Sequence, residues 1–295
     1  PGLTAYKLSS NENPYPPLPG VLEAAHEAVG QMNRYPDMGA AALHAAIAEH
    51  VGVPVEQVTV GTGSVALIYE IVQAFCEPGD EVVMAWRSFE AYPIAVRLVG
   101  ATPVEVPLTS AAEHDLEAML AAIGERTRVV VVCTPNNPPG PGVGSDALAD
   151  FVARVPEDVL VVVDEAYAEF AAKPTRALEL TRTRDNVVVL RTFSKAYGLA
   201  GLRVGYAVAP ARIASAVRKV ALPFGVSDVA QAAAVASLDA EEELLARVDA
   251  LVAERDRTVA AARELGWAVP DSQANFFWLP TVGRTTEVAE VFARD

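Results

Sequence analysis

Lys195 follows a short apolar run, VVVL, which is typical of a buried strand. A lysine at the end of such a strand carries a desolvation cost unless the protein uses its amine. Ser194 precedes it directly, and Arg203 follows eight positions later. The pattern therefore predicts a functional amine next to a hydroxyl and a guanidinium, a pair of groups that suits an anion.

Four other apolar runs each end in a different kind of chemistry. The residues after them are, in chain order, GTGS (61–64), RSF (87–89), TPNNP (134–138) and DEAY (164–167). Parallel strands bring their carboxyl ends to one edge of a sheet, and ligands bind there. We expect a phosphate-type turn, an aromatic ring, an amide, a carboxylate with a phenol, and the lysine to meet at that edge.

The elements that must position these groups alternate between strands and helices. Strand-like runs lie at 58–60, 81–85, 129–133, 159–163 and 187–190, and helical patterns separate most of them, as at 64–76 and 145–155. This alternation predicts an α/β fold with a mostly parallel sheet covered by helices on both faces. Further on, apolar residues at helical spacing predict a long helix that ends at Gly266, and residues 274–280, ANFFWLP, look like a strand of another unit.

Composition excludes several classes of protein. The 295 residues carry a net charge of −15, which argues against nucleic acid and anionic membranes as partners. No apolar run reaches the roughly 18 residues of a membrane helix. Cys76 and Cys133 stand among apolar residues and are expected to be core thiols of a cytoplasmic protein. The four histidines show no ligand spacing, so we expect no metal.

Each motif also has a plain structural explanation. The glycines of the first turn suit any tight connection, Asn-Asn-Pro is ordinary turn chemistry, and Asp164 can cap the next element. Phe89 can belong to the core, and Lys195 can lie in a solvated loop. These explanations weaken when taken together, because every strand end carries a different chemical part.

The parts suit one cofactor, pyridoxal phosphate. Lys195 can form a Schiff base with it, and a carboxylate such as Asp164 keeps its ring nitrogen protonated. Asn137 and Tyr167 can donate to its phenolate oxygen, and Phe89 can offer a ring face. Its phosphate needs helix N-terminal N–H groups, hydroxyls and a guanidinium. The candidates for these contacts are Gly63, Ser64, Val65, Thr192, Ser194 and Arg203.

Five motifs in this order resemble the fold-type I aminotransferases, and more narrowly the histidinol-phosphate aminotransferase group. They are NENP (11–14), RYPD (34–37), NNP (136–138), DEAY (164–167) and SK with GLR (194–195 and 201–203). The resemblance covers nearly the whole chain. It implies a seven-stranded type of sheet in the large domain. It also implies a homodimer with active sites at the subunit interface, acting on small-molecule amino acids and 2-oxo acids.

The resemblance also implies a role for each matching residue. It gives Lys195 the Schiff base and the proton transfer, Asp164 the ring nitrogen, and Asn137 with Tyr167 the phenolate oxygen. It places Thr192, Ser194 and Arg203 on the phosphate. By the same resemblance Tyr35 reaches the phosphate of the other subunit, and Asn13 lies in an arm that closes over the substrate.

The sequence departs from the family pattern at two places besides its C-terminal part, and the first of them bears on the substrate. Many histidinol-phosphate enzymes carry two acidic residues where Val65 and Ala66 stand here, and GTGSVAL with WRSFEAY (86–92) looks like the phenylalanine or aromatic amino acid branch. Pro139 replaces a usual threonine and is expected to be tolerated. We therefore expect an aromatic amino acid as donor, with histidinol phosphate as the alternative. Whether Phe89 or Tyr92 stacks on the cofactor stays open.

The family pattern divides the chain into three expected parts. Residues 1–27 form an arm and the start of a small domain, residues 28–240 a large cofactor domain, and residues 241–295 an interdomain helix and part of a small α+β domain, incomplete at the C-terminus. The arginine that binds the substrate carboxylate normally comes later than Asp295, and we expect Arg284 and Arg294 to be solvated. The 295 residues are thus expected to bind cofactor but to transaminate poorly.

Two other classes remain as alternatives. Gly61, Gly63 and Ala66 fit a dinucleotide fingerprint in letter, but Asp80 and Glu81 precede the second strand, where that motif wants an acid at its end. A non-catalytic relative would bind the cofactor without turnover. A visible absorption band separates a pyridoxal-phosphate protein from a nicotinamide enzyme.

Overall fold

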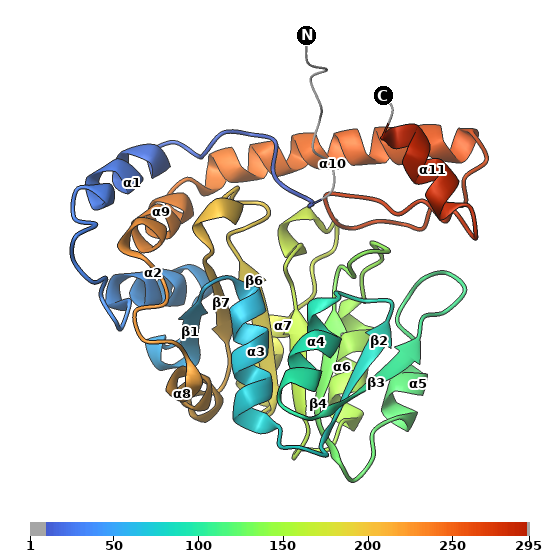
Figure 1. Cartoon of the computed structure of the whole chain (residues 1–295), viewed down its shortest axis with the longest axis horizontal. Coiled ribbons are helices and arrows are strands. Elements are labelled where there is room, and N and C mark those ends of the chain that lie inside the picture. The colour runs from blue at the N-terminus through green and yellow to red at the C-terminus, as the bar shows by residue number, and fades with distance from the viewer. Residues whose placement is uncertain (1–9, 294–295) are drawn as a thin grey trace.

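The computed structural model describes residues 10–293 and contains one seven-stranded sheet with the order β1-β7-β6-β5-β4-β2-β3 (Figure 1). Strands β2 to β6 pair in parallel, and β7 is antiparallel to both its neighbours, β1 and β6. The mostly parallel α/β sheet predicted from the sequence is therefore confirmed. The strands are β1 (Val58–Gly61), β2 (Glu81–Trp86), β3 (Thr102–Pro107), β4 (Thr127–Cys133), β5 (Leu160–Asp164), β6 (Val187–Thr192) and β7 (Gly205–Val208).

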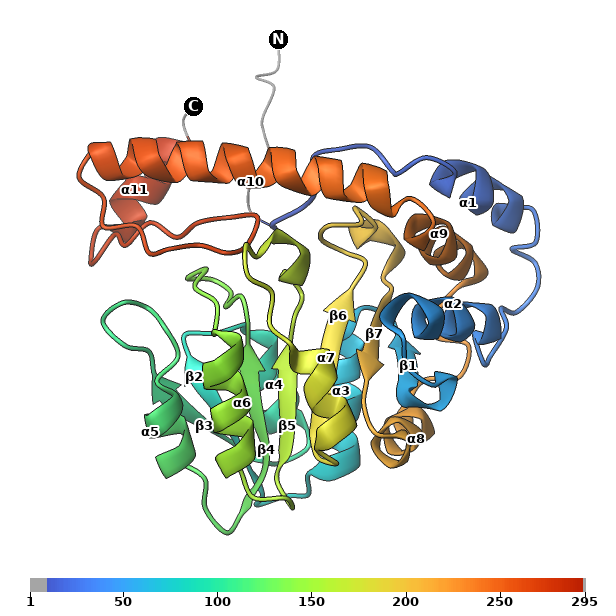
Figure 2. The same cartoon turned by 180° about the vertical axis from the view of Figure 1, so that it is seen from behind.

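Helices cover both faces of the sheet, with α3, α4 and α8 packed on one face and α5, α6 and α7 on the other (Figures 1 and 2). The remaining helices lie beside the β1 edge of the sheet or over the edge where the parallel strands end. The helices are α1 (Val21–Val29), α2 (Ala41–Val51), α3 (Ser64–Phe75), α4 (Ala91–Leu98), α5 (Leu116–Ala121), α6 (Ser145–Arg154), α7 (Ala177–Thr183), α8 (Ala211–Val220), α9 (Asp228–Leu238), α10 (Glu241–Glu264) and α11 (Thr285–Phe292), with short 3₁₀ turns η1 (Val55–Gln57), η2 (Ala168–Phe170) and η3 (Ala200–Leu202).

The valine-rich runs form central strands because both faces of the sheet are covered. Along β5, Leu160 and Val162 pack into one core cluster, whereas Val161 and Val163 pack into the other. This alternation is the two-residue period of a strand buried on both sides. The edge strand β3 was not predicted, because it is only partly buried and contains two prolines, which edge strands tolerate.

Helix α10 lies across the edge of the sheet where the parallel strands end (Figures 1 and 2). It buries Leu244, Val248 and Val259, and Gly266 follows it with φ 88°, as the predicted cap requires. Neither α10 nor any other helix within residues 10–293 is both long and apolar enough to cross a membrane.

The strand expected at residues 274–280 is not formed. Residues 267–284, between α10 and α11, contain neither helix nor strand. Among residues 10–293 the strands all belong to the seven-stranded sheet, and this segment pairs with none of them. The division into three parts remains a prediction.

A charged cluster is buried at the carboxyl ends of β5 and β6. Arg191 donates to Glu165 Oε2 through Nη2 at 2.8 Å and Nε at 3.0 Å, and Thr175 donates its hydroxyl to the other oxygen. Glu169 in η2 lies near this pair, but its buried Oε2 has no hydrogen-bond partner among residues 10–293. Burial raises the pKa of Glu169 to about 7, although Arg191 partly opposes the shift.

We predict that Glu169→Gln abolishes part of the pH dependence of stability. The folded pKa of about 7 exceeds the ordinary 4.5, so the folded state binds more protons than the unfolded state. The contribution of Glu169 to the free energy of unfolding is then fully present below about pH 4.5 and is lost as the pH rises through about 7. The substitution should remove on the order of 1–3 kcal/mol of this fall.

Urea unfolding at pH 5 and pH 8 measures this effect. Glu242→Gln, at an exposed position of α10, serves as the control because it removes a carboxylate that is already solvated. The same fall in stability for wild type and Glu169→Gln would show that Glu169 does not titrate in the folded protein.

Candidate active site

A cavity of about 650 Å³ lies at the edge where the parallel strands end, under the segment between α10 and α11. The structure brings ten residues singled out in the sequence together around it. They are Ser64, Val65, Phe89, Asn137, Asp164, Tyr167, Thr192, Ser194, Lys195 and Arg203. The parallel pairing of β4, β5 and β6 explains this convergence, because these strands end side by side.

Asp164, the last residue of β5, forms part of the cavity wall and is only 2% exposed. Its Oδ2 accepts a hydrogen bond from the Tyr92 hydroxyl at 2.7 Å, and its Oδ1 accepts one from the Ala166 N–H at 3.1 Å. Burial raises the pKa of Asp164 to about 6, and these two hydrogen bonds limit the shift. The carboxyl group is therefore sensitive to any cation placed beside it.

Tyr92 and Phe89 have different positions in the site. Tyr92 is fully buried in α4 with its hydroxyl on Asp164, whereas Phe89 lines the cavity. The two rings pack edge to face, with centroids 5.7 Å apart and planes at 90°. Phe89 is thus the ring that can offer a face to a ligand, and Tyr92 supports the carboxylate. Phe89 and Tyr92 stand three positions apart in the sequence, and the sequence alone did not show which of the two rings faces the ligand.

Lys195 extends into the cavity from the loop after β6. Its Nζ donates to the carbonyl oxygens of Ser10 at 3.0 Å and Asn11 at 3.4 Å. Burial lowers the pKa of Lys195; Glu12 opposes the shift and Arg203 adds to it. An amine with a lowered pKa is more readily neutral, which is the form that accepts a proton or attacks a carbonyl.

An anion-binding corner lies at the start of α3. Arg203 Nη1 donates to Ser194 Oγ at 3.3 Å, and Thr192 donates to the same oxygen at 3.0 Å. The residue before α3 is Gly63, which has no side chain to cap the helix, so the N–H groups of the first turn can face an anion. A hydroxyl pair, a guanidinium and a helix N-terminus together form a phosphate-type donor set.

Two glycines allow this corner to close tightly. Gly63 has φ 84°, and a Cβ there would lie 2.6 Å from Arg203 Nη2. A Cβ on Gly205, the first residue of β7, would lie 2.5 Å from the backbone nitrogen of Ser64. Gly205 was not predicted, and its role depends on the approach of β7 to the turn, which the sequence does not show.

Tyr167 lies at another side of the cavity with its hydroxyl pointing to two amides. Asn11 Nδ2 and Asn137 Nδ2 donate to it at 3.2 Å and 3.3 Å. Burial raises its pKa well above the usual range, so the phenol stays protonated. Because both amides donate to its oxygen, the hydroxyl proton remains available for a ligand oxygen.

Three predicted residues, Gly63, Asn13 and Tyr35, lie outside the cavity lining, and Gly63 borders it as the residue before α3. Asn13 donates to the carbonyl oxygens of Ala196 at 2.8 Å and Lys195 at 3.3 Å, and so fastens the arm to the lysine loop. Tyr35 is 81% exposed, with its ring centroid 4.8 Å from that of Phe224. The proposed contacts of Asn13 with substrate and of Tyr35 with a second subunit stay predictions.

The expected solvated position of Arg284 is observed. It is exposed and pairs with Glu287 at 2.9 Å, and Arg294 lies outside the described residues. Among residues 10–293, the cations that line the cavity are Lys195 and Arg203.

One side of the cavity was not identified from the sequence. Residues 276–278, Phe-Phe-Trp, line it from the irregular segment after α10. The apolar run in ANFFWLP was the available signal, but it favoured a strand.

The comparisons with known proteins agree with this site. The family model for aminotransferase class I and II matches residues 4–294. The aromatic amino acid aminotransferase of Streptomyces avermitilis is 58% identical over 98% of this chain and 81% of its own length, and that of Streptomyces coelicolor is 56% identical with the same coverage. The histidinol-phosphate aminotransferase of Sinorhizobium meliloti, solved in complex with pyridoxal-5'-phosphate, has a TM-score of 0.85 and 33% identity, covering 91% of this chain and 73% of that chain.

We predict that Tyr92→Phe raises the pKa of Asp164 above its value of about 6, because the carboxylate loses a buried donor while its desolvation is unchanged. Carbon-13 NMR of the aspartate carboxyls in the cofactor-free protein measures the shift. Tyr206→Phe, in another buried tyrosine on β7, is the matched control. An unchanged Asp164 titration in Tyr92→Phe would mean that the hydrogen bond does not influence the carboxylate.

Proposed function

The chain belongs to the class I and II aminotransferase family, and on that premise we propose that it transfers the amino group of an aromatic amino acid to a 2-oxo acid such as 2-oxoglutarate. The observation that carries the proposal is the meeting of Lys195, the buried Asp164 and the donor set at the start of α3 in one cavity. We further propose pyridoxal 5'-phosphate as the cofactor.

The residues around the cavity fit that cofactor. The α3 N-terminus with Arg203 and Ser194 offers donors to a phosphate, and Gly63 leaves the space that a Cβ would fill. Asp164 offers a carboxylate to a ring nitrogen, and Phe89 a face to the ring. When bound, pyridoxal phosphate supplies an aldehyde that links to an amine and a ring that withdraws electrons from the substrate's α-carbon.

Each residue then has a definite task. Lys195 Nζ, with its lowered pKa, takes a proton from the substrate α-carbon and later returns one. Asp164 holds a proton on the ring nitrogen, and a cation there should lower the pKa of Asp164 from about 6 because opposite charges favour the ionised carboxylate. The Tyr167 hydroxyl would donate a hydrogen bond to the cofactor's phenolate oxygen, and the hydrogen bond from Asn137 orients that hydroxyl.

The cavity supports an aromatic donor over histidinol phosphate. A substrate phosphate would need cationic or hydrogen-bonding partners beyond those of the cofactor. The cations lining the described cavity are Lys195 and Arg203, which the proposal already assigns to cofactor chemistry. Three aromatic residues, 276–278, also line the cavity. An uncharged aromatic side chain therefore matches the lining better than a phosphate ester does.

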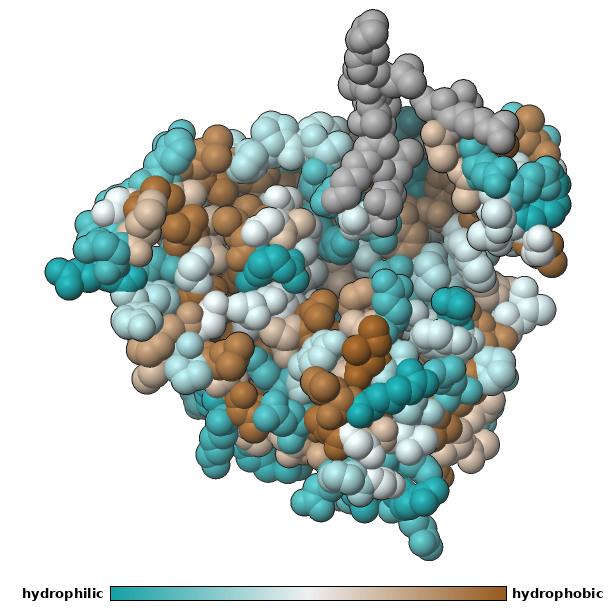
Figure 3. All heavy atoms as spheres, in the orientation of Figure 1, coloured by the Kyte–Doolittle hydropathy of each residue, from teal (hydrophilic) through white to brown (hydrophobic). Residues whose placement is uncertain are grey.

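We also propose that the enzyme is a homodimer in the cytoplasm. The linkers after α1 and α8 expose an apolar patch of Met32 at 74%, Tyr35 at 81%, Met38 at 66% and Leu222 at 76%. Hydrophobic side chains are also exposed nearby around α1 and α9 (Figure 3). A second copy would remove this area from water. Free thiols at Cys76 and Cys133 support a reducing compartment.

The first test compares phenylalanine with histidinol phosphate as amino donor in single-turnover reactions with the pyridoxal-phosphate-loaded enzyme. We expect phenylalanine to be favoured at least about tenfold in kcat/KM. Lys195→Ala should abolish both reactions, whereas Lys173→Ala, at an exposed loop position, should change neither. Preference for histidinol phosphate would contradict the substrate assignment, and turnover by Lys195→Ala would contradict the role of the lysine.

The second test concerns the shared site. If Tyr35 acts in the other subunit's site, mixing Tyr35→Ala with Lys195→Ala protein creates dimers with one intact site. After subunit exchange, the mixture should recover roughly a quarter of wild-type activity, because half of the dimers are mixed and each has one working site. Native mass spectrometry verifies the exchange. Mixed dimers without recovered activity would show that Tyr35 is not needed across the interface.

A further inference from the structure

Residues 276–278, named here the aromatic wall, face the cavity from a segment that belongs to no strand or helix. The segment lies under α10 and over the ends of the parallel strands (Figure 1). The aromatic wall therefore lines the same cavity as the groups at the ends of the parallel strands.

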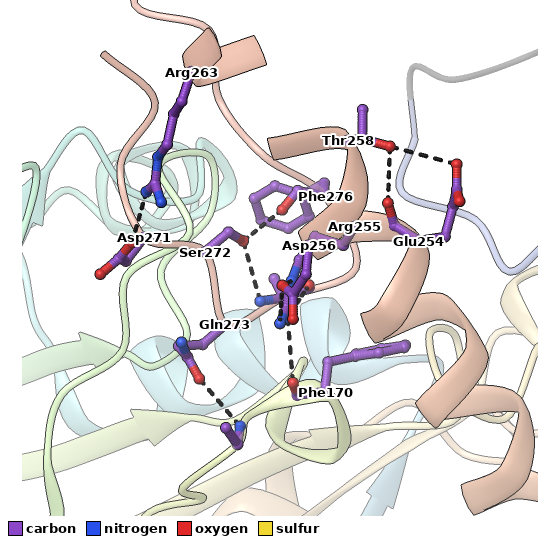
Figure 4. Close-up of polar contacts among 12 residues, drawn as sticks. Phe170, Glu254, Arg255, Asp256, Thr258, Arg263, Asp271, Ser272, Gln273 and Phe276 are labelled. Atoms are coloured by element: carbon purple, nitrogen blue, oxygen red, sulfur yellow. Dashed lines mark hydrogen bonds and ion pairs between the residues drawn. The ribbon is translucent and has the colours of Figure 1, made fainter. Parts of the chain in front are cut away.

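Arg255 of α10 holds the segment in place. Its side chain is only 5% exposed, and Nη1 donates to the carbonyl oxygens of Ala274 at 2.9 Å and Phe170 at 3.4 Å (Figure 4). Asp256 balances its charge at 2.8 Å. One buried guanidinium thus joins the long helix, the turn η2 and the segment that carries the wall.

Other hydrogen bonds fix the same segment on both sides of Ala274. Ser272 Oγ donates to the Phe276 carbonyl at 2.5 Å and accepts from the Ala274 N–H at 3.2 Å (Figure 4). Gln273 accepts from the Ala172 N–H at 3.1 Å, and its own N–H donates to the Gly140 carbonyl at 2.9 Å. The backbone of the wall is therefore held in position before a substrate enters.

The three rings of the wall have different surroundings. Phe276 packs edge-on against Tyr167, with centroids 5.1 Å apart and planes at 81°. Phe277 and Trp278 pair with no other aromatic ring within residues 10–293, and Trp278 is 36% exposed. Phe276 thus packs on a residue of the proposed cofactor site, whereas Phe277 and Trp278 line the cavity without an aromatic neighbour among residues 10–293.

We infer that Phe277 and Trp278 form the subsite for the substrate side chain and select aromatic over branched aliphatic amino acids, and that Arg255 is the positioning residue of this subsite. The inference rests on the proposed function. Aromatic rings attract one another beyond the area they bury, so a benzyl group gains from this wall what an isobutyl group does not. The lining carboxylate Glu90 adds no partner for an anionic side chain.

The experiment measures both binding and turnover in Trp278→Leu and Phe277→Leu. By calorimetry, Trp278→Leu should weaken 3-phenylpropionate about tenfold and 4-methylpentanoate less than threefold. The kcat/KM ratio of phenylalanine to leucine should fall by a similar factor. Trp267→Leu, on the same segment but away from the cavity lining, is the matched control and should leave both ratios unchanged.

Arg255→Lys and Arg255→Met test the positioning role. The methionine variant loses the donors to Ala274 and Phe170, so it should lower the phenylalanine-to-leucine ratio through KM while the visible absorbance of the bound cofactor is retained. The lysine variant, which keeps one donor, should restore part of the ratio and remains informative if the methionine variant does not fold. Arg255 variants that fold with an unchanged ratio would overturn its role.

The outcomes separate this inference from the proposed function. Turnover of both amino acids with an unchanged ratio in Trp278→Leu and Phe277→Leu would overturn the subsite and leave the aminotransferase activity intact. A wild-type enzyme that neither binds pyridoxal phosphate nor turns over any amino acid would refute the proposed function itself, and unaltered 3-phenylpropionate affinity in both variants would still overturn the subsite.

Discussion

The desolvation of the cavity between the strand ends and α10 determines the behaviour of its acid and its base. Burial raises the pKa of Asp164 and lowers that of Lys195, so it moves both groups toward their neutral forms. Hydrogen bonds from Tyr92 and Ala166 keep the carboxylate from shifting further. A site of this kind is electrostatically incomplete, because it favours a ligand that brings a cation to the acid and an anion to the α3 end.

Much of this arrangement could be predicted from the sequence because central parallel strands have a strong signature. Runs such as VLVVV are apolar at every position, since both faces are covered, and the first polar residue marks the strand end. The five strands predicted for the sheet and the three predicted helices, at 64–76, at 145–155 and before Gly266, match the observed elements within a few residues. Residues that follow these runs, Ser64 the first and Arg203 the last along the chain, consequently meet in one cavity.

The parts that were missed depend on contacts between distant segments. Strand β3 lies at the edge and alternates too weakly to be recognised, and β7 is a four-residue strand that begins two residues after the GLR motif. The role of Tyr92 follows from its hydrogen bond across 72 positions to Asp164, which spacing within α4 cannot reveal. The run at 274–280 shows the limit of periodicity, because a short apolar stretch does not specify a strand without a neighbour to pair with.

The antiparallel direction of β7 has a consequence for how this family can vary. Thr192 pairs with Gly205, and the Phe193 N–H donates to the Val204 carbonyl at 3.1 Å, so the loop that carries Lys195 and Arg203 is closed at its base by two adjacent strands. Surface loops usually absorb insertions and deletions with little harm. Here a change in loop length would have to move either the amine or the guanidinium relative to the fixed base. Length variation should therefore accumulate in connections at the opposite edge of the sheet. The loop between β6 and β7 should keep a constant length, because that length sets the distance between the amine of Lys195 and the guanidinium of Arg203.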